Sequence, residues 1–265
     1  MIPYIFHLFW AGDHLSYLRY LTFKTCRLKN PDARIILHHS SSYAKNINWT
    51  REKQDFQTDM GPSYFDKLKD LNVEIVPYTK HTELQPNYQS DFMRWECLYQ
   101  DGGIYADTDQ IFLKSFNNLL NCDFFYCSYF ARIIYYPVGL IGSISGHFIP
   151  AQMIQLTKQH LNTNEYQSIG PPLFRALMTH PQVAPQILSQ GIRNYPQEYF
   201  YPAPEPDKYC EAMFEGNGPD VTKSYALHWF GGYSKSHEFN SKYTETLVKS
   251  SNDTISTLIR EMKAI

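Results

Sequence analysis

The sequence has no long apolar run and no cluster of basic residues, and these two absences exclude whole classes of protein. Nothing in it approaches the ~20 apolar residues that a membrane-spanning helix needs. Lys and Arg are scattered and the formal net charge is -2, so the phosphate-neutralising patch of a nucleic-acid-binding protein is missing. We therefore expect no transmembrane segment and no nucleic-acid partner.

The cysteines lack the spacing of a disulfide framework or of a zinc site. There are five of them, an odd number, their separations are scattered, and no CxxC occurs. A signal peptide is also not visible, because the N-terminal segment has no basic region and carries Pro3 and His7. Reduced thiols and the missing leader predict a cytoplasmic protein with neither disulfides nor zinc.

Charged residues are few and hydrophobic residues are many, which excludes a disordered chain. Charged residues make up 19% of the 265 residues and hydrophobic ones 43%, enough for a sizeable core in one large domain. No internal repeat or low-complexity linker divides the chain. Aromatic residues reach 16%, which predicts both aromatic core packing and rings available to stack on sugars or bases.

Segments with the apolar pattern of a strand alternate with a segment of helical spacing along the first part of the chain. Ile2 to Trp10 has the character of a buried strand, Leu15 to Lys29 has helical spacing, and Ala33 to His38 is rich in β-formers. This order predicts parallel strands joined by a right-handed crossover, and hence an α/β fold. Ligands of such folds bind at the carboxyl ends of strands, where Trp10 and Asp107 lie in sequence.

Further elements are expected along the rest of the chain. Ser90 is predicted to cap a helix that Gly102 and Gly103 end. Pro196 to Pro206 carries four prolines and is expected to be an extended surface loop. The other expected elements are strands at Val73 to Pro77, Ile104 to Ala106, Ile111 to Leu113, Phe124 to Phe130 and Val138 to Ser143, and helices at Ser90 to Gln100, Ala151 to His160, Pro172 to Met178 and within Ser241 to Met262.

Two carboxylates follow the strand at Ile104 to Ala106. Asp107 and Asp109 flank Thr108, and such residues are often plain turn formers. The alternative is a metal site, because hard oxygen ligands suit Mg²⁺ or Mn²⁺ bridging to a diphosphate. One carboxylate would then coordinate the metal while the other holds ribose or sugar hydroxyls.

The preceding helix presents a second charged pair. Asp91 and Arg94 are three residues apart and therefore share a helix face. They form either a solvated surface ion pair of little energetic value or a grip on sugar hydroxyls beside the turn at Asp107. Gly102 and Gly103 allow the sharp turn that brings the two segments together.

These residues belong to longer motifs that resemble a known family. The combined pattern SDxxR followed by GGxYxDxD resembles the signature of the DxD-containing sugar-binding glycosyltransferases. That family includes initiating α-mannosyltransferases and α-1,4-galactosyltransferases, and the region is similar to the glucosylating domains of large bacterial toxins. Four stretches carry the resemblance: Ile2-Pro3 with His7 and Trp10-Ala11-Gly12, Ser90 to Asp109, Ile169-Gly170-Pro171, and Ala226-Leu227-His228-Trp229.

The resemblance implies a GT-A-like nucleotide-binding sandwich with a mixed, mostly parallel central sheet. It also implies roles for individual residues. Asp91, Arg94, Asp107 and Asp109 would be the catalytic group. Trp10 with Ala11 and Gly12 would hold the nucleotide base, Asp91 and Arg94 the donor sugar, Asp107 the ribose or sugar, and Asp109 with Asp107 and His228 the metal. Trp10 and His228 each have a structural alternative, as a core ring and a packed histidine.

One stretch departs from the family. Gly231-Gly232-Tyr233-Ser234 stands where members often carry a Ser-Trp pair. Ser234 is the expected donor ligand from this stretch. The sequence leaves open whether His228, Tyr233 or Ser234 closes the diphosphate site.

The resemblance implies one glycosyltransferase domain over residues 1–265. Residues 1–115 would form its nucleotide-sugar-binding half, and 116–265 the acceptor side with a C-terminal helical region. The implied reaction is retaining transfer of a hexose from a nucleotide diphosphate sugar, UDP-linked in preference, to a glycan or other hydroxyl acceptor with Mn²⁺ or Mg²⁺. The alternatives are a GDP-sugar-dependent mannosyltransferase and a non-catalytic carbohydrate-binding descendant of the fold.

Other enzyme classes fit the sequence less well. Asp107-Thr108-Asp109 approaches the loop of haloacid-dehalogenase phosphatases, but no Asp-Asp dipeptide follows it. The loop lacks the later ligands and the glycine of an EF-hand. The Gly-rich, basic phosphate loop of a nucleotidyltransferase is missing near the N-terminus.

Overall fold

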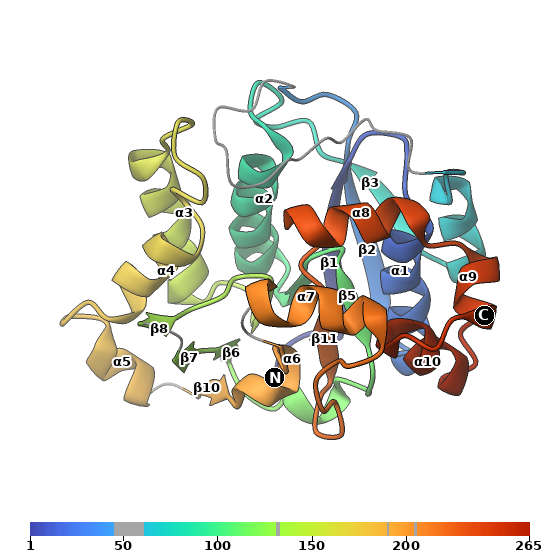
Figure 1. Cartoon of the computed structure of the whole chain (residues 1–265). Helices are drawn as coiled ribbons and strands as arrows, with labels where there is room; N and C mark the ends of the chain where they lie inside the picture. Colours follow the sequence, from blue (N-terminus) through green and yellow to red (C-terminus); the bar gives the residue numbers. More distant parts are fainter. Residues whose placement is uncertain (45–60, 131–132, 190, 204–205) are drawn as a thin grey trace.

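The fold is described from a computed structural model of the chain (Figure 1). The description covers residues 1–44, 61–130, 133–189, 191–203 and 206–265, without the side chains of 188–189, 206–208, 234–235 and 237–238. A seven-stranded sheet in the order β10-β6-β9-β4-β1-β2-β3 forms its centre. Its strands are β1 (Ile5–Ala11), β2 (Arg34–Ser40), β3 (Glu74–Pro77), β4 (Gly103–Ala106), β6 (Phe124–Cys127), β9 (Leu140–Ser143) and β10 (Ile192–Tyr195).

The sheet is mixed and mostly parallel, as predicted. β9 pairs antiparallel with both β4 and β6, whereas β1 pairs parallel with β2 and β4. The strand–helix–strand opening is confirmed, with α1 (Tyr17–Lys29) as the crossover between β1 and β2. β1 and β4 therefore end at the same edge of the sheet, and both lead into the residues singled out from the sequence.

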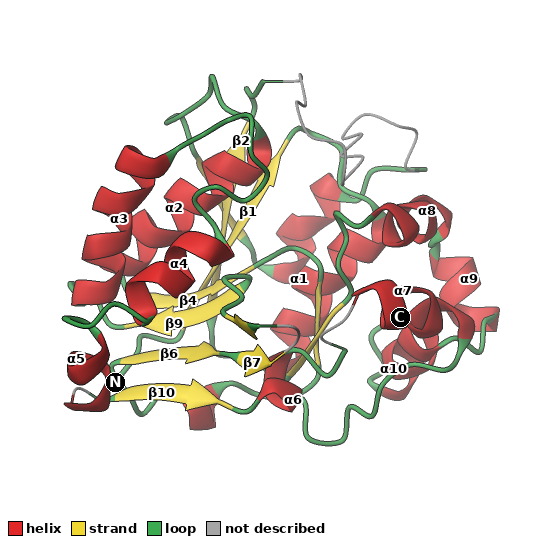
Figure 2. Cartoon of the chain, turned by 60° about the vertical axis from the view of Figure 1, so that its left-hand side comes forward, coloured by secondary structure: helices red, strands yellow, loops and turns green. Residues whose placement is uncertain are grey.

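Helices cover both faces of the sheet (Figure 2). Side-chain alternation along β1 divides the core, because Phe6 and Leu8 pack on the α1 side and Phe9 packs on the α2 side. The remaining helices are α2 (Pro86–Gln100), α3 (Phe148–His160), α4 (Pro171–Met178), α5 (Ala184–Ser189), α6 (Gln197–Phe200), α7 (Pro206–Glu215), α8 (Ser234–Lys242), α9 (Glu245–Ser250) and α10 (Thr254–Glu261), with 3₁₀ turns at Phe65–Leu71 and Asn117–Leu119.

The helix that carries Asp91 begins earlier than predicted. α2 starts at Pro86, a favourable first helical residue, and Ser90 lies inside it with its hydroxyl donating to the carbonyl of Asn87. Ser90 is therefore not the N-cap. The predicted stop is correct, since Gly102 and Gly103 both have positive φ, 68° and 103°.

The proline-rich stretch is not the surface loop that its composition predicts. It contains α6, and Phe200, Tyr201 and Ala203 are all buried in the core. The prolines restrict the backbone without forcing it outward, because the apolar and aromatic side chains between them have a core to fill.

A small second sheet brings the C-terminal region to the centre of the molecule. β5 (Gln110–Phe112) pairs antiparallel with β11 (Ala226–His228), and this register sets His228 opposite Gln110. Trp229 continues the pairing, because its N–H donates to the carbonyl of Asp109. A third pairing joins β7 (Tyr129–Phe130) to β8 (Ile134–Tyr135), which replaces the end of the single strand expected over Phe124 to Phe130.

None of the helices in the described part of the chain combines the length and the apolar character that crossing a bilayer requires.

Candidate active site

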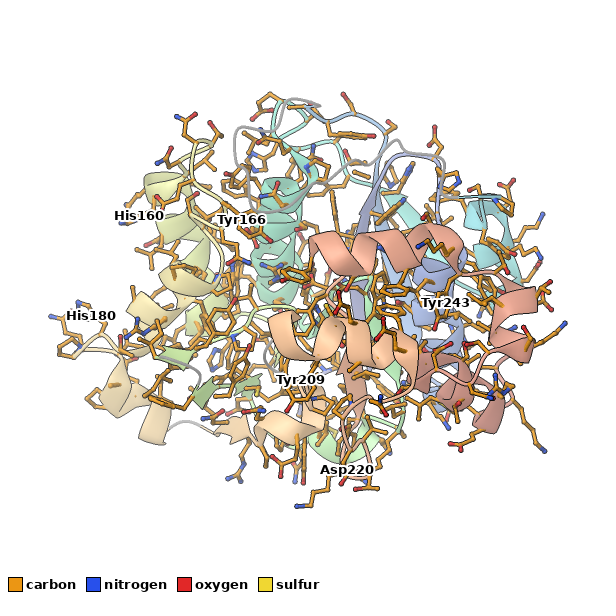
Figure 3. The ribbon with its side chains drawn as sticks, in the orientation of Figure 1. His160, Tyr166, His180, Tyr209, Asp220 and Tyr243 are labelled. Carbon is orange, nitrogen blue, oxygen red and sulfur yellow. The ribbon has the colours of Figure 1, made fainter. Side chains whose placement is uncertain are left out.

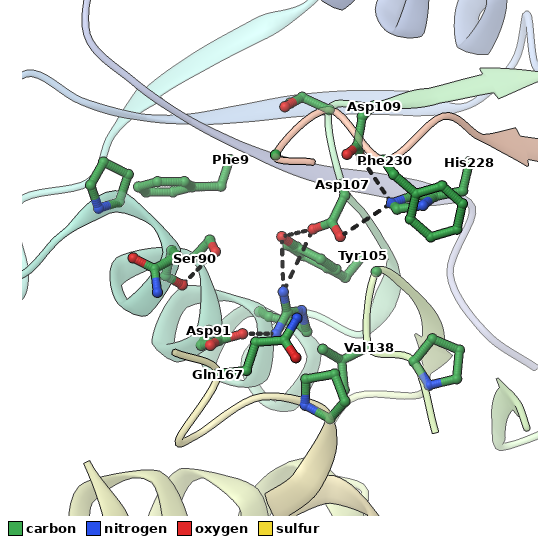
Figure 4. A pocket seen from close by; sticks show the side chains of 18 of the residues that line it. Phe9, Ser90, Asp91, Tyr105, Asp107, Asp109, Val138, Gln167, His228 and Phe230 are labelled. Atoms are coloured by element: carbon green, nitrogen blue, oxygen red, sulfur yellow. Dashed lines mark hydrogen bonds and ion pairs between the residues drawn. The ribbon is translucent and has the colours of Figure 1, made fainter. Parts of the chain in front are cut away.

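A cavity of about 470 Å³ opens where β1 and β4 end. This size is typical of small-ligand sites. Figure 4 shows charged side chains from α2, from the turn after β4 and from β11 converging on it. The residues predicted from the sequence that line it are Trp10, Ala11, Asp91, Arg94, Asp107, Asp109, His228 and Tyr233.

Two predicted residues are not among those that line the cavity. Gly12 lies just beyond β1 with a φ of 90°, which continues the backbone past the strand end. Ser234 is the first residue of α8, and its side chain lies outside the described part of the structure. The cavity lining therefore gives no support to a donor contact from Gly12, and the one from Ser234 stays a prediction outside the described residues.

Asp107, Asp109 and His228 come together although the histidine is far away in sequence. Nε2 of His228 lies 3.0 Å from Oδ1 of Asp109 and 3.9 Å from Oδ2 of Asp107. One potential ligand atom from each residue fits within 4.8 Å of the others. Two carboxylates and an imidazole form a donor set that suits Mg²⁺ or Mn²⁺.

The surroundings of Asp109 favour its charged form. Burial alone raises a carboxyl pKa, but His228, Arg19 and the Gly231 N–H, which donates to Oδ2 at 2.7 Å, together hold the pKa of Asp109 well below its ordinary value. Burial likewise opposes the His228 imidazolium, but Asp109 and then Asp107 raise the pKa of His228 above its ordinary value. The site is therefore built to hold positive charge beside Asp109.

The buried polar atoms at this site also fit a cation. Nδ1 of His228 is buried with no hydrogen-bond partner among the described residues, and Oδ1 of Asp109 is buried facing Nε2 of His228 at 3.0 Å. A buried carboxylate oxygen needs positive charge beside it, which either an imidazolium or a bound cation supplies. Asp107, Asp109 and His228 are therefore suited to bind a divalent metal ion.

Asp91 and Arg94 are not the solvated surface pair that was one interpretation of their spacing. Both side chains are buried, and Nη1 of Arg94 donates to Oδ1 of Asp91. Burial raises the pKa of Asp91, and the Arg94 charge opposes that shift. An ion pair buried away from water needs further hydrogen-bond partners to offset the loss of hydration.

Further hydrogen bonds connect the Asp91–Arg94 pair to Asp107. Nη2 of Arg94 donates to the Tyr105 hydroxyl at 3.3 Å, and this hydroxyl donates to Oδ1 of Asp107 at 2.7 Å. The guanidinium also lies 4.3 Å from the centroid of the Tyr105 ring. A continuous buried network thus joins Asp91 on α2 to the carboxylate after β4.

Arg19 is a site residue that sequence reasoning missed. Its guanidinium lies between the rings of Trp10 and Trp229, at 5.2 and 4.9 Å from their centroids. Nη1 donates to the Thr108 hydroxyl at 3.1 Å and lies 3.9 Å from Oδ2 of Asp109. The helix was predicted, but its spacing did not show that Arg19 turns toward the cavity.

Trp10 is partly buried and lines the cavity. Its indole N–H donates to the carbonyl of His14 at 2.9 Å, which fixes the ring. This geometry is compatible with base stacking and with the structural alternative. His7, in contrast, is fully buried in β1, as predicted.

Other residues complete the walls. Gln167 comes from the loop before α4, Pro171 from the Gly170-Pro171 turn of the resemblance is the first residue of α4, and Gly170 lies close to Asp91. The lining is also rich in aromatic rings, of which Tyr166 is labelled in Figure 3. These rings, called here the aromatic wall, are Tyr129, Tyr135, Tyr166, Tyr201, Phe230 and Tyr233.

Comparisons with known proteins agree with this geometry. Residues 19–125 match the family model described as "Glycosyltransferase sugar-binding region containing DXD motif". An uncharacterized glycosyltransferase of Acanthamoeba polyphaga mimivirus is 29% identical over 109 residues, covering 38% of this chain and 43% of the relative. The match therefore spans less than half the length of that relative.

Two solved structures share the fold. The PaToxG glycosyltransferase superposes with a TM-score of 0.51 at 20% identity, over 71% of this chain and 74% of that one. The apo form of the glycosyltransferase GlyE from Streptococcus pneumoniae gives 0.50 at 11% identity, over 100% of this chain and 64% of that one. The likeness confirms the predicted GT-A-like α/β architecture. Residues 19–125, which carry Asp91, Arg94, Asp107 and Asp109, therefore resemble the DXD-containing sugar-binding region of glycosyltransferases.

Proposed function

We propose that the chain is a metal-dependent glycosyltransferase that moves a hexose from a nucleotide diphosphate sugar to a hydroxyl acceptor. The convergence of Asp107, Asp109 and His228 at the mouth of one cavity carries this proposal. The donor is proposed to be UDP-linked and the transfer retaining, as the family resemblance implies. Residues 1–115 would supply most of the donor side, and 116–265 the acceptor side.

Asp107, Asp109 and His228 would hold Mn²⁺ or Mg²⁺. When bound, the ion supplies Lewis-acid stabilisation of the negative charge on the departing diphosphate. Arg19 adds a fixed positive charge 3.9 Å from Oδ2 of Asp109, and its stacking between two indoles orients it. Both charges are in place before the reaction, so little reorganisation is needed as the leaving group departs.

Asp91 and Arg94 would position the donor sugar. Arg94 already bonds Asp91 and reaches Asp107 through Tyr105, so both carboxylates are held in fixed orientations. A carboxylate fixed in this way accepts sugar hydroxyls without further ordering cost. The proposed role of Arg94 is therefore to orient these carboxylates.

Trp10, with Ala11 beside it, would stack on or border the nucleotide base. The aromatic wall formed by Tyr129, Tyr135, Tyr166, Tyr201, Phe230 and Tyr233 would receive the acceptor and keep water from the transferred sugar. A glycan or another hydroxyl compound fits this mixture of rings and hydroxyl groups.

A donor panel tests the proposal. UDP- and GDP-linked hexoses are incubated with Mn²⁺, Mg²⁺ or a chelator, and nucleotide release and the anomeric configuration of the product are measured. We expect UDP-sugar turnover that a chelator abolishes and that Asp109→Asn lowers by about 100-fold or more. Asp220→Asn, at an exposed loop carboxylate, is the matched control and should keep full activity.

Each remaining outcome decides between alternatives. Chelator-insensitive turnover, or an active Asp109→Asn variant, contradicts the metal assignment. Preference for GDP-mannose supports the mannosyltransferase alternative. Tight sugar-nucleotide binding with neither hydrolysis nor transfer supports the non-catalytic carbohydrate-binding alternative.

A further inference from the structure

A second group of metal-ligand side chains lies under the helix that carries Asp91. His7 on β1, His38 on β2 and Cys97 on α2 each direct one ligand atom to a common point, within 4.8 Å of one another. All three face the α2 side of the sheet, because Leu8 and Leu37 point to the other face. His7 is fully buried, Cys97 is 5% exposed, and His38 is partly exposed.

The hydrogen bonds of His7 fix its tautomer and turn its inner nitrogen toward His38. Nε2 lies 2.9 Å from the carbonyl oxygen of Gly102, which can only accept, so Nε2 carries the ring proton. Nδ1 therefore presents a lone pair, and it accepts a hydrogen bond from Nε2 of His38 at 3.0 Å. A ring N–H donated to a backbone carbonyl is the usual arrangement of a metal-bound histidine.

The spacing needs little adjustment to accept a metal ion. Tetrahedral zinc has bonds of about 2.0–2.1 Å to nitrogen and 2.3 Å to sulfur, which sets ligand atoms roughly 3.3–3.6 Å apart. The two imidazole nitrogens need to separate by a few tenths of an ångström from 3.0 Å, and the sulfur needs to approach them. The thiol of Cys97 would give up a weak hydrogen bond, which it donates to the carbonyl of Arg94 at 3.3 Å.

The chemistry of this group differs from that of the catalytic site. Two imidazoles and a thiol, with no carboxylate in the cluster within the described part of the chain, favour a softer ion than Mg²⁺ or Mn²⁺. The sequence predicts no zinc site, because the three ligands lie on separate segments with no CxxC spacing. The sheet and α2 bring them together.

We propose that His7, His38 and Cys97 form a zinc site, separate from the site at Asp107, Asp109 and His228. Zn²⁺ bonds to Nδ1 of His7, Nε2 of His38 and Sγ of Cys97, and a water molecule takes the fourth tetrahedral position. The thiol proton leaves to solvent, and His38 changes tautomer, losing the proton on Nε2 and gaining one on Nδ1 through solvent. The ion ties β1, β2 and α2 together one helical turn from Arg94. It thereby stabilises the half of the fold that presents Asp91 and Arg94.

Metal content and spectroscopy of the full chain test the site. The protein is purified, exposed to Zn²⁺ and dialysed against excess Mn²⁺, and its bound zinc is then measured. We expect one retained zinc per chain and, after replacement by Co²⁺, a thiolate-to-cobalt charge-transfer band. Cys97→Ala should remove the band and weaken zinc binding by roughly 100-fold.

Controls separate this site from other ligands and from misfolding. Cys122→Ala changes another buried cysteine, and Asp109→Asn disables the proposed catalytic site, so both should retain the zinc and the band. His38→Gln, at a partly exposed position, serves if Cys97→Ala does not fold, and it should lose the zinc. Loss of all zinc to Mn²⁺, a cobalt band that survives in Cys97→Ala, or zinc loss in Asp109→Asn would overturn the proposal.

Discussion

Asp109 keeps its charge although its side chain is buried, because His228, Arg19 and the Gly231 N–H surround it. Its chemical type could be predicted from the sequence, since two carboxylates after a strand suit a hard cation. Its partners could not, because Arg19 and Gly231 carry no motif that marks them. For single residues, the sequence indicates which side chains could be ligands, and the neighbours that the fold places around them set the pKa of each ligand.

Tyr105 links Arg94 to Asp107 and is predicted to orient the metal-binding carboxylate. Tyr105→Phe removes the hydroxyl that donates to Oδ1 of Asp107 at 2.7 Å and leaves the ring over Arg94 in place. We expect Mn²⁺ affinity or kcat/KM to fall by about 10–100-fold, as for other partners of metal ligands. Metal titration and donor kinetics measure this.

Tyr195→Phe is the matched control for Tyr105→Phe. It removes a hydroxyl that donates to the Leu119 carbonyl at 3.0 Å, away from the cavity. Its kinetics should equal those of the unmodified chain, with a stability loss of about 1 kcal/mol. Equal kinetics in both variants would show that the Tyr105 hydroxyl does not position Asp107.

His147 is predicted to make stability depend on pH. Burial lowers its pKa from 6.5 to about 4, so between these values the unfolded chain binds a proton that the folded chain rejects. Stability therefore falls as pH drops from 6.5 toward 4, by at most about 1.4 kcal/mol per pH unit for this group. Denaturant unfolding across this range measures the slope.

A variant that keeps the helix cap isolates this effect. His147 accepts the N–H of Ile149 at the start of α3, and His147→Asn can still cap the helix while removing the titration. Its stability should fall less steeply with acid. His180→Asn changes an exposed histidine instead, so a slope that drops equally in both variants would argue against the buried ring.

At the scale of elements, β1, α1 and β2 could be predicted because their apolar periods are long and regular. The start of α2 was misplaced, since Ser90 has the chemistry of a cap and Pro86 offers an equally good first residue. β10 was missed because its exposed positions leave no clear alternation. More than one residue in a segment can start a helix, and tertiary contacts, which the local sequence does not show, decide where the element begins.

The pairing of β9 beside β4 predicts a requirement for glycine at position 139. A Cβ there would lie 2.4 Å from Oδ2 of Asp107, while the Gly139 carbonyl accepts the Asp107 N–H at 2.8 Å and fixes the backbone. Gly139→Ala should displace the carboxylate and lower metal-dependent turnover by about 10-fold or more, with the fold kept. Donor kinetics at varied Mn²⁺ concentration check this.

Gly218→Ala is its counterpart away from the site. A Cβ at Gly218 would lie 2.5 Å from Oγ1 of Thr254, a comparable clash with a side chain that the cavity does not use. It should lower stability by about 1–3 kcal/mol and leave the kinetics unchanged. Unchanged Mn²⁺ dependence in Gly139→Ala would contradict the close approach as a determinant of the site.

At the scale of the whole molecule, the site depends on contacts between distant segments. Asp109 and His228 meet because β11 pairs with β5, and no local pattern predicts this pairing. Family resemblance alone assigns the histidine to the metal, and the structure brings its Nε2 to 3.0 Å from Oδ1 of Asp109. The division into residues 1–115 and 116–265 remains a prediction, and His228 from the second part lies beside Asp109 from the first.

A site assembled from both parts of the chain should stabilise the whole fold when it is filled. UDP with Mn²⁺ at about 100 times its dissociation constant should add about 2.7 kcal/mol and raise Tm by roughly 5–10 °C in one transition. His228→Asn should lose most of this rise, because the imidazole from β11 would no longer help hold the ion beside Asp109. GDP, or UDP with a chelator, should give a much smaller rise. A full UDP shift in the chelator, or in His228→Asn, would mean that nucleotide binding does not use the ion held between the two parts of the chain.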